Sequence, residues 1–322
     1  MNTVDKVAIT SRSFSANDHL VGELRARYKN ITLNETGKTL AGDELLNFLK
    51  GHSKVIVGLE NFDTNLINQL GELKVISKFG VGLNNIDLES MKKNGILLGF
   101  QPGTNRQSVA ELALMHILIA LRKVPSSKED IANNIWSQNK GNELFGKSVG
   151  IIGFGNIGQR LAELIEPFNC KVMFYDSINF TNQDLIKKFP SKSQVFINNL
   201  QQKSLHDTLE KSDVISIHLP LFKDTHNIIS LNELACLKND ARIINTSRGG
   251  IVDETALEEF LKNNKNAFAA FDVFEKEPAF EHPLLKLNNF YATSHLGSMT
   301  KEGVISMGMA AIDGLDENNI PT

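Results

Sequence analysis

Three side chains capable of acid–base and anion chemistry follow apolar runs of strand length. Arg248 lies in the segment NTSRGG, Glu277 in DVFEKEP and His295 in TSHLGS. Ligands of open α/β sheets bind at the carboxyl ends of the strands, where these segments are expected. Taken alone, His295 would more often be structural than catalytic, and a loop arginine such as Arg248 commonly makes a structural salt bridge. Together the three residues supply a fixed cation, a carboxylate and a group that titrates near neutral pH.

This set of side chains meets the requirements of hydride transfer at C2 of a small 2-hydroxy acid. The guanidinium of Arg248 can hold the carboxylate of the acid and polarise the C2 oxygen, on which charge develops. The imidazole of His295 can take or give the hydroxyl proton. Glu277 beside it can hold one tautomer and favour the protonated ring. The three segments therefore predict a 2-hydroxy acid dehydrogenase.

A glycine motif predicts the cofactor site. Gly153, Gly155 and Gly158 form the pattern GxGxxG directly after the apolar run SVGII, and Asn156 and Ile157 open an amphipathic helix. The first glycine permits a tight turn, the second lets a pyrophosphate approach the backbone, and the third lets helix and strand pack closely. The helix N-terminus then offers unpaired N–H groups to the phosphates.

Asp176 ends the next expected strand, 18 residues beyond Gly158. A carboxylate at this place accepts hydrogen bonds from the hydroxyls of the adenosine ribose and repels a 2′-phosphate. No arginine occupies positions 176–178. The alternative is a surface aspartate that merely ends a strand. The motif with its spacing favours NAD over NADP.

Apolar runs of strand length alternate with amphipathic helical stretches, which predicts α/β layers with parallel sheets. Four strands are expected early in the chain, at Lys6–Thr10, Val55–Gly58, Val75–Phe79 and Ile96–Phe100. A second series is expected at Ser148–Gly153, Lys171–Tyr175, Val195–Ile197, Val214–His218, Arg242–Asn245, Ala267–Asp272 and Asn289–Ala292. Helices are expected at 107–122 and from 301 to about 315, with a frayed polar tail after Asp313.

The order of these elements predicts two domains. The turn residues of QPGTN break the first series near residue 104, and the final helix follows the loop that begins near residue 294. We therefore expect a first domain of residues 1–104 plus 294–322 and an inserted dinucleotide-binding domain of residues 105–293. Because the chain would cross twice between them, we expect a hinge.

Composition excludes several classes of protein. The net charge of −3 argues against nucleic acid as a partner, and no apolar stretch approaches the roughly 18 residues of a membrane span. The N-terminal residues lack the apolar core of a signal peptide. Cys170 and Cys236 are the only cysteines and show no metal-ligand spacing. We expect a cytoplasmic protein without a bound metal.

In combination, these motifs resemble those of the D-isomer-specific 2-hydroxyacid dehydrogenases, from about residue 54 to 309. The resemblance implies that Arg248 binds the substrate carboxylate and carbonyl, that His295 is the acid–base group and that Glu277 pairs with it. It also implies a flavodoxin-like substrate domain with an inserted Rossmann domain, and a homodimer through the nucleotide domains. The further cofactor residues that it implies are His218 and Pro220 on the adenosine side, Thr246, and Asp272 at the nicotinamide carboxamide. For His218 the alternative is nearly as good: it is merely a buried histidine at the end of a strand.

The segment KFGVGLNNID in the first domain resembles the substrate loop of that family. The backbone N–H groups of Val81 and Gly82 would cradle the substrate carboxylate. Two positions depart from the family pattern: Lys78 replaces an arginine and Asn84 an aspartate. The first departure could change how a distal group such as a phosphate is held. Lys78 and Arg106 are the candidate cations, although each is more often an ordinary surface charge.

Among family members, the HLGSMT and GGIVD segments look most like 3-phosphoglycerate dehydrogenases of serine biosynthesis. Only 27 residues follow His295, so we expect no C-terminal serine-sensing domain. Reduction of glyoxylate or hydroxypyruvate fits the same core chemistry. The other class of function is an NAD-sensing corepressor, a scaffold on the same fold that binds partner peptides.

Overall fold

A computed structural model describes residues 2–321 and divides into two compact units. The first comprises Met1–Asn105 and Met299–Thr322, and the second Arg106–Ser298. The chain returns to the first unit at residue 299 rather than at the expected 294. The loop that carries His295 stays with the second unit because its backbone is bound to Asp272, whose carbonyl accepts from His295 N at 2.9 Å.

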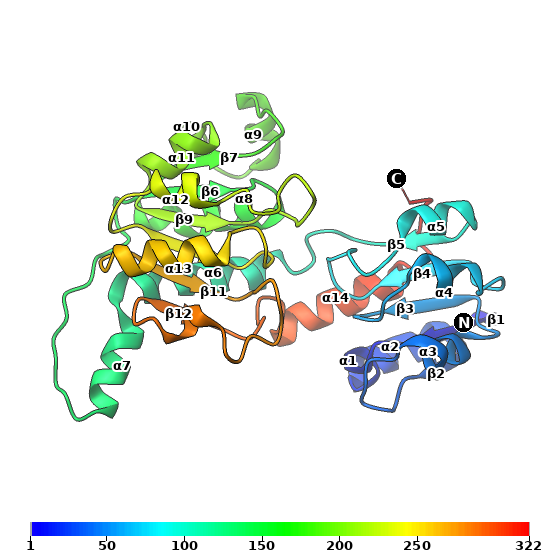
Figure 1. The fold of residues 1–322 in the computed structure, drawn as a ribbon. Coiled ribbons are helices and arrows are strands. Elements are labelled where there is room, and N and C mark those ends of the chain that lie inside the picture. The colour runs from blue at the N-terminus through cyan, green and yellow to red at the C-terminus, as the bar shows by residue number, and fades with distance from the viewer. Residues whose placement is uncertain (1, 322) are drawn as a thin grey trace. The chain divides into compact units, whose positions relative to one another are not determined.

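The first unit is a five-stranded parallel sheet in the order β2-β1-β3-β4-β5 (Figure 1). This order is that of flavodoxin-like domains. The strands are β1 (Asn2–Ile9), β2 (Tyr28–Leu33), β3 (Lys54–Val57), β4 (Val75–Lys78) and β5 (Leu97–Gly99). The helices are α1 (Arg12–Ser15), α2 (Asp18–Arg27), α3 (Gly42–Leu49), α4 (Thr64–Asn68), α5 (Leu88–Lys93) and α14 (Lys301–Asp313).

Both faces of this sheet are covered, as its continuous apolar strands require. Leu45 of α3 and Met91 of α5 join one buried cluster, whereas Leu24 of α2 and Ile312 of α14 join the other. The segment after α14 is ordered, so the expected frayed tail was wrong. Asn319 exchanges two backbone hydrogen bonds with Leu98 of β5, at 2.7 and 3.1 Å.

The second unit is a seven-stranded parallel sheet in the order β12-β11-β10-β9-β6-β7-β8. From β8 onward this is the doubly wound order of Rossmann folds with one added strand. The strands are β6 (Ser148–Ile152), β7 (Lys171–Tyr175), β8 (Leu200–Gln202), β9 (Val214–Ile217), β10 (Arg242–Asn245), β11 (Phe268–Phe271) and β12 (Phe290–Ala292). The strand order reverses between β6 and β9, which is where such sheets bind ligands.

Helices pack on both faces of this sheet. Those described are α6 (Arg106–Arg122), α7 (Val124–Ala132), α8 (Asn156–Ile165), α9 (Asn182–Lys188), α10 (Gln194–Asn199), α11 (Leu205–Lys211), α12 (Leu231–Ala235) and α13 (Glu254–Asn263). Two short 3₁₀ helices are η1 (Glu166–Phe168) and η2 (Pro283–Lys286). One buried cluster includes Ile117 of α6 and Leu161 of α8, and the other Leu234 of α12 and Leu257 of α13. Between residues 2 and 321, no helix is both long and apolar enough to cross a membrane.

The strand expected at Val195–Ile197 is wrong, because these residues belong to α10. The hydroxyl of Ser193 caps this helix by accepting from Phe196 N at 3.2 Å, and Phe196 and Ile197 are buried on its inner side. The strand itself is β8, which begins at Leu200. A short apolar run is compatible with either element, and here the N-cap serine decides for the helix.

Candidate active site

The turn between β6 and α8 fits a dinucleotide. Gly153 has a φ of 94°, and a Cβ there would lie 2.8 Å from the carbonyl of His218. A Cβ at Gly158 would lie 2.3 Å from the Gly153 oxygen. A Cβ at Gly155 would meet no atom within 4 Å. Packing thus accounts for two glycines, whereas the middle one leaves open space at a helix N-terminus, where phosphate is favoured.

Asp176 follows β7 and is bound to this turn. One carboxylate oxygen accepts from Phe154 N at 2.7 Å, and the other accepts from Ile178 N at 2.9 Å. Asn156 and Ile157 open α8, whose N-cap residue Gly155 provides no side-chain hydrogen bond. The strand-end carboxylate and the uncapped helix terminus are therefore next to each other. This is the arrangement that receives a ribose and its phosphates.

The ends of β9 and β10 contribute two buried polar atoms that have no hydrogen-bond partner among the described residues. Burial lowers the pKa of His218 to about 3, so its imidazole is neutral. The Nε2 atom of this ring lies 2.9 Å from the Ser216 hydroxyl. His218 Nδ1 and the Thr246 hydroxyl are buried without a hydrogen-bond partner in the described structure. Pro220 is exposed. Because unpaired buried polar groups are costly, these atoms are suited to a polar ligand.

His295, Glu277 and Arg248 lie in loops at the carboxyl-end edge of the same sheet. The Nδ1 atom of His295 is 2.9 Å from Glu277 Oε2, and Glu277 Oε1 accepts from Phe274 N at 3.0 Å. His295 has a φ of 57°, which places it in the left-handed region. With Nδ1 facing the carboxylate, Nε2 is the nitrogen that remains for proton transfer.

Arg248 follows β10 and is a partly buried cation. Its Nη1 donates to the Ser247 carbonyl at 2.6 Å. Burial lowers the pKa of Arg248, and the nearby charge of Glu277 opposes this shift. Since a guanidinium stays protonated in proteins, the desolvated charge is available to a carboxylate ligand.

Asp272 fixes the loop that carries His295. The residue is 1% exposed, and its carboxylate accepts from the Thr293 hydroxyl at 2.5 Å, from Leu296 N at 2.7 Å and from Gly297 N at 2.8 Å. The structure thus gives it a positioning role that the sequence-based expectation of a carboxamide contact missed. That contact stays a prediction. The signal was present in the sequence, because a buried aspartate after a strand needs donors close by.

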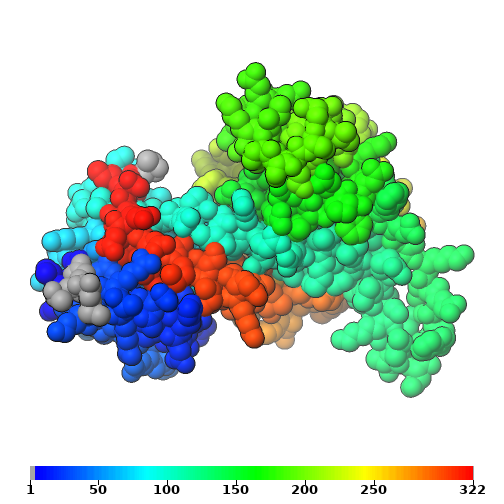
Figure 2. Space-filling model, turned by 180° about the vertical axis from the view of Figure 1, so that it is seen from behind, coloured from blue at the N-terminus to red at the C-terminus, as the bar shows by residue number. Residues whose placement is uncertain are grey.

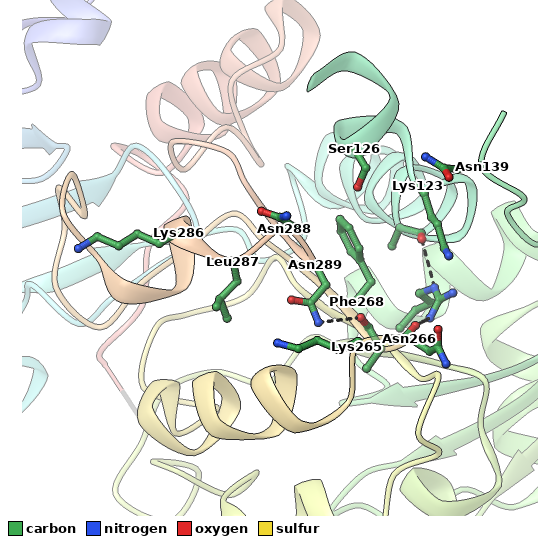
Figure 3. Close-up of a pocket in the computed structure, with 13 residues that line it drawn as sticks. Lys123, Ser126, Asn139, Lys265, Asn266, Phe268, Lys286, Leu287, Asn288 and Asn289 are labelled. Carbon is green, nitrogen blue, oxygen red and sulfur yellow. Dashed lines mark hydrogen bonds between the residues drawn. The ribbon is translucent and has the colours of Figure 1, made fainter. Parts of the chain in front are cut away.

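A cavity of about 540 Å³ lies elsewhere in the second unit (Figure 3). Its lining includes Arg242, Phe268 and Asn289, which stand at or just before the amino ends of β10, β11 and β12. The residues discussed above follow the carboxyl ends of strands of this sheet. None of them lines the cavity, so this cavity is separate from the candidate active site.

Comparisons with known proteins agree with this geometry. Residues 114–297 match the family model described as "D-isomer specific 2-hydroxyacid dehydrogenase, NAD binding domain". A hydroxypyruvate reductase of Thermotoga maritima is 34% identical over 287 residues, which are 87% of this chain and 89% of the relative. The chain belongs to the D-isomer specific 2-hydroxyacid dehydrogenase family.

Other members of the family differ in length and name. The D-3-phosphoglycerate dehydrogenase of Methanocaldococcus jannaschii is 34% identical over 85% of this chain, but the match covers only 51% of that relative. Among solved structures, NAD-bound 3-phosphoglycerate dehydrogenase of Entamoeba histolytica has a TM-score of 0.77 at 26% identity, covering 96% of this chain and 93% of that one. D-lactate dehydrogenase of Aquifex aeolicus, with NAD and lactic acid, has a TM-score of 0.78 at 25% identity, covering 97% and 93%.

The segment KFGVGLNNID of the first unit carries the residues that are expected to bind substrate. Lys78, at the end of β4, is 6% exposed, and its ammonium donates to Gly58 O at 2.5 Å and to Asn85 Oδ1 at 2.8 Å. This cation therefore joins two loops of the first unit, and its contact with a distal phosphate stays a prediction. Val81 and Gly82 follow in the loop, half-buried, and their role as a carboxylate cradle stays a prediction.

Proposed function

We propose that this family member reversibly oxidises C2 of a small D-2-hydroxy acid. The contact between His295 Nδ1 and Glu277 Oε2 carries the proposal, because it leaves Nε2 to take the hydroxyl proton. Arg248 binds the carboxylate and stabilises charge on the C2 oxygen. NAD, when bound, accepts the hydride that leaves C2. In reduction, His295 returns the proton to the oxygen.

For the cofactor we propose NAD. Asp176 supports this choice because its carboxylate is already oriented by Phe154 N and Ile178 N beside the glycine turn. A 2′-phosphate placed there would meet a fixed negative charge. Asn156, Ile157 and the three glycines would hold the pyrophosphate, His218 and Pro220 the adenosine side, and Thr246 and Asp272 the nicotinamide side.

For the substrate we propose 3-phosphoglycerate, which is oxidised to 3-phosphohydroxypyruvate. The motifs after β10 and β12 and the names of several relatives support it. A second candidate is hydroxypyruvate or glyoxylate, and a specific observation favours it: Lys78 is bound inside its own unit. An unphosphorylated acid needs no such cation.

The test is a turnover assay with NAD, NADP and their reduced forms. The panel contains 3-phosphoglycerate, D-glycerate and D-lactate for oxidation, and hydroxypyruvate and glyoxylate for reduction. Turnover of at least one acid is expected, with NAD preferred. If every acid fails while NAD still binds, the dehydrogenase proposal is refuted and an NAD-sensing corepressor scaffold takes its place.

We also propose a homodimer through the second unit. Helix α7 and the segment after it project from the body of this unit (Figures 1 and 2). No residue of α7 is buried, and Ile131, Ile135 and Trp136 are 57%, 53% and 84% exposed. Exposed apolar side chains that lie close together in the sequence of a projecting arm are typical of protein contacts. Light scattering of the chain and of a Trp136→Ser variant tests this, and a wild-type monomer at micromolar concentration would refute it.

A further inference from the structure

The loop of residues 273–282, here called the Glu277 loop, contains no helix or strand. It connects β11 to η2 and carries the carboxylate that faces His295. Inside the loop, Glu277 Oε1 accepts from Phe274 N at 3.0 Å. A contact of 2.9 Å between two side chains on separate loops requires that each loop be held in place. Asp272 holds the loop of His295, so the Glu277 loop needs a support of its own.

Glu254 provides that support. It is the first residue of α13, and its side chain is 10% exposed. Its Oε1 accepts from Glu275 N at 2.7 Å, and its Oε2 lies 3.0 Å from His282 Nε2. Glu275 is near the beginning of the Glu277 loop and His282 is its last residue. One carboxylate therefore binds both ends of the loop, with Glu277 between them.

The tautomer of His282 is determined by its other contact. Its Nδ1 accepts from Leu284 N at 3.3 Å and caps η2. The Nε2 atom must then carry the proton and donate it to Glu254. The ring also packs against Phe274, with centroids 5.2 Å apart. Turning this imidazole would break both the cap of η2 and the bond to Glu254.

We propose that Glu254 is a positioning residue of the reaction: by binding Glu275 and His282, it holds Glu277 Oε2 against His295 Nδ1. It acts through Glu277 and touches no reacting atom. Other charged groups of this region include Lys276 and Glu281 in the loop itself and Arg248 near Glu277. The side chain of Glu275 lies 3.6 Å from His226 at the exposed rim. The importance of Glu254 for turnover rests on the proposed function, whereas its geometric role does not.

The substitution Glu254→Gln tests this role. A glutamine has only one side-chain oxygen, so it cannot accept hydrogen bonds from both Glu275 N and His282 Nε2 in the way that the two carboxylate oxygens do. When its oxygen accepts from Glu275 N, its NH2 group faces the Nε2–H of His282, and two donors then oppose each other. The control is Glu258→Gln, one turn along α13, where the carboxylate pairs with Lys262 at the surface. We expect Glu254→Gln to lower kcat about 10- to 100-fold at unchanged KM for NAD, because misplacements of about 1 Å have effects of that order. Glu258→Gln should behave as wild type.

A spectroscopic readout separates this proposal from the proposed function. The Nδ1–H proton of His295 gives a downfield resonance when it is bound to Glu277, assigned by its loss in His295→Gln. Without any substrate, this resonance should weaken in Glu254→Gln and in Glu277→Gln but not in Glu258→Gln. If Glu254→Gln does not fold, Glu254→Asp is used, since the shorter side chain cannot reach both partners.

The outcomes are distinct. Loss of the resonance in Glu254→Gln together with non-additive effects of Glu254→Gln and Glu277→Gln on kcat supports the proposal. Loss of the resonance in a chain that turns over no 2-hydroxy acid supports the geometric role and refutes the proposed function. An unchanged resonance in both Glu254→Gln and Glu254→Asp overturns the proposal, whatever the effect on kcat. Additive effects on kcat overturn it as well.

Discussion

Stability of this protein should fall steeply in mild acid, because His116 is buried as a neutral imidazole. His116 lies in α6 at 0% exposure, with Nε2 3.3 Å from the Thr293 hydroxyl. Burial lowers its pKa from 6.5 to about 4, and the charge of Asp272 only partly opposes this shift. His116 therefore stays unprotonated in the folded chain at pH values just below about 6.5, where the same side chain is protonated in the unfolded chain.

The sign and size of the effect follow from linkage. As the pH falls through 6.5, the unfolded state gains a proton and the folded state does not, so the free energy of unfolding decreases until the pH reaches about 4. A pKa shift of this size lowers the free energy of unfolding by roughly 3 kcal/mol once the pH has fallen below both pKa values. About 2 kcal/mol of that loss falls between about pH 7 and pH 5. This one side chain therefore removes a noticeable share of a typical domain stability of roughly 5–15 kcal/mol.

The assay is urea unfolding followed by circular dichroism at both pH values, on wild type, on His116→Gln and on His206→Gln. His206 is exposed on α11 and serves as the control. His116→Gln should lower stability at neutral pH, because a glutamine fits the site less well. It should also reduce the pH 7-to-5 difference by about 2 kcal/mol, whereas His206→Gln keeps that difference. An undiminished pH dependence in His116→Gln would refute the reasoning.

Three further predictions concern the cofactor and the proton. Gly155→Ala should weaken NAD binding at unchanged melting temperature, whereas Gly158→Ala should lower the melting temperature, because only the Cβ at position 158 collides with the protein. Calorimetry measures both NAD binding and the melting temperature. A loss of stability in Gly155→Ala alone would contradict this account. Asp176→Ala should weaken NAD and relax the discrimination against NADP; unchanged preference in steady-state kinetics would mean that the ribose contact lies elsewhere. His295→Ala should abolish turnover with little change in NAD affinity by fluorescence titration, and loss of cofactor binding would argue against its role.

The sequence predicts best those strands whose buried residues form a clear pattern. β7 and β10 have the expected bounds: β10 is fully buried, as a central parallel strand should be, and in β7 buried residues alternate with more exposed ones. β2 was not expected because only Tyr28 of its six residues is fully buried, as suits an edge strand. The error at Val195–Ile197 has another origin, since three apolar residues do not reveal whether they repeat with the period of a helix or of a strand.

At the site, the sequence predicts which side chains are available but not which contacts they make. His295 and Glu277 meet as expected, since strand ends in a parallel sheet share one edge. Asp272 and Glu254 were not recognised as supports, because the fold and not the sequence pattern decides which donors reach them. Those donors are the side chains of Thr293 and His282 and backbone N–H groups of the two loops. The internal bonds of Lys78 depend on where Gly58 and Asn85 fall in the fold.

The division of the chain has a consequence for protein engineering. The proposed cofactor residues, Arg248, Glu277 and His295 all lie in the uninterrupted segment Arg106–Ser298, which the chain enters and leaves once each. A chimaera with two junctions is therefore enough to transfer all of these proposed residues together. Recombination at residues 105/106 and 298/299 would join this set to the first unit of another family member.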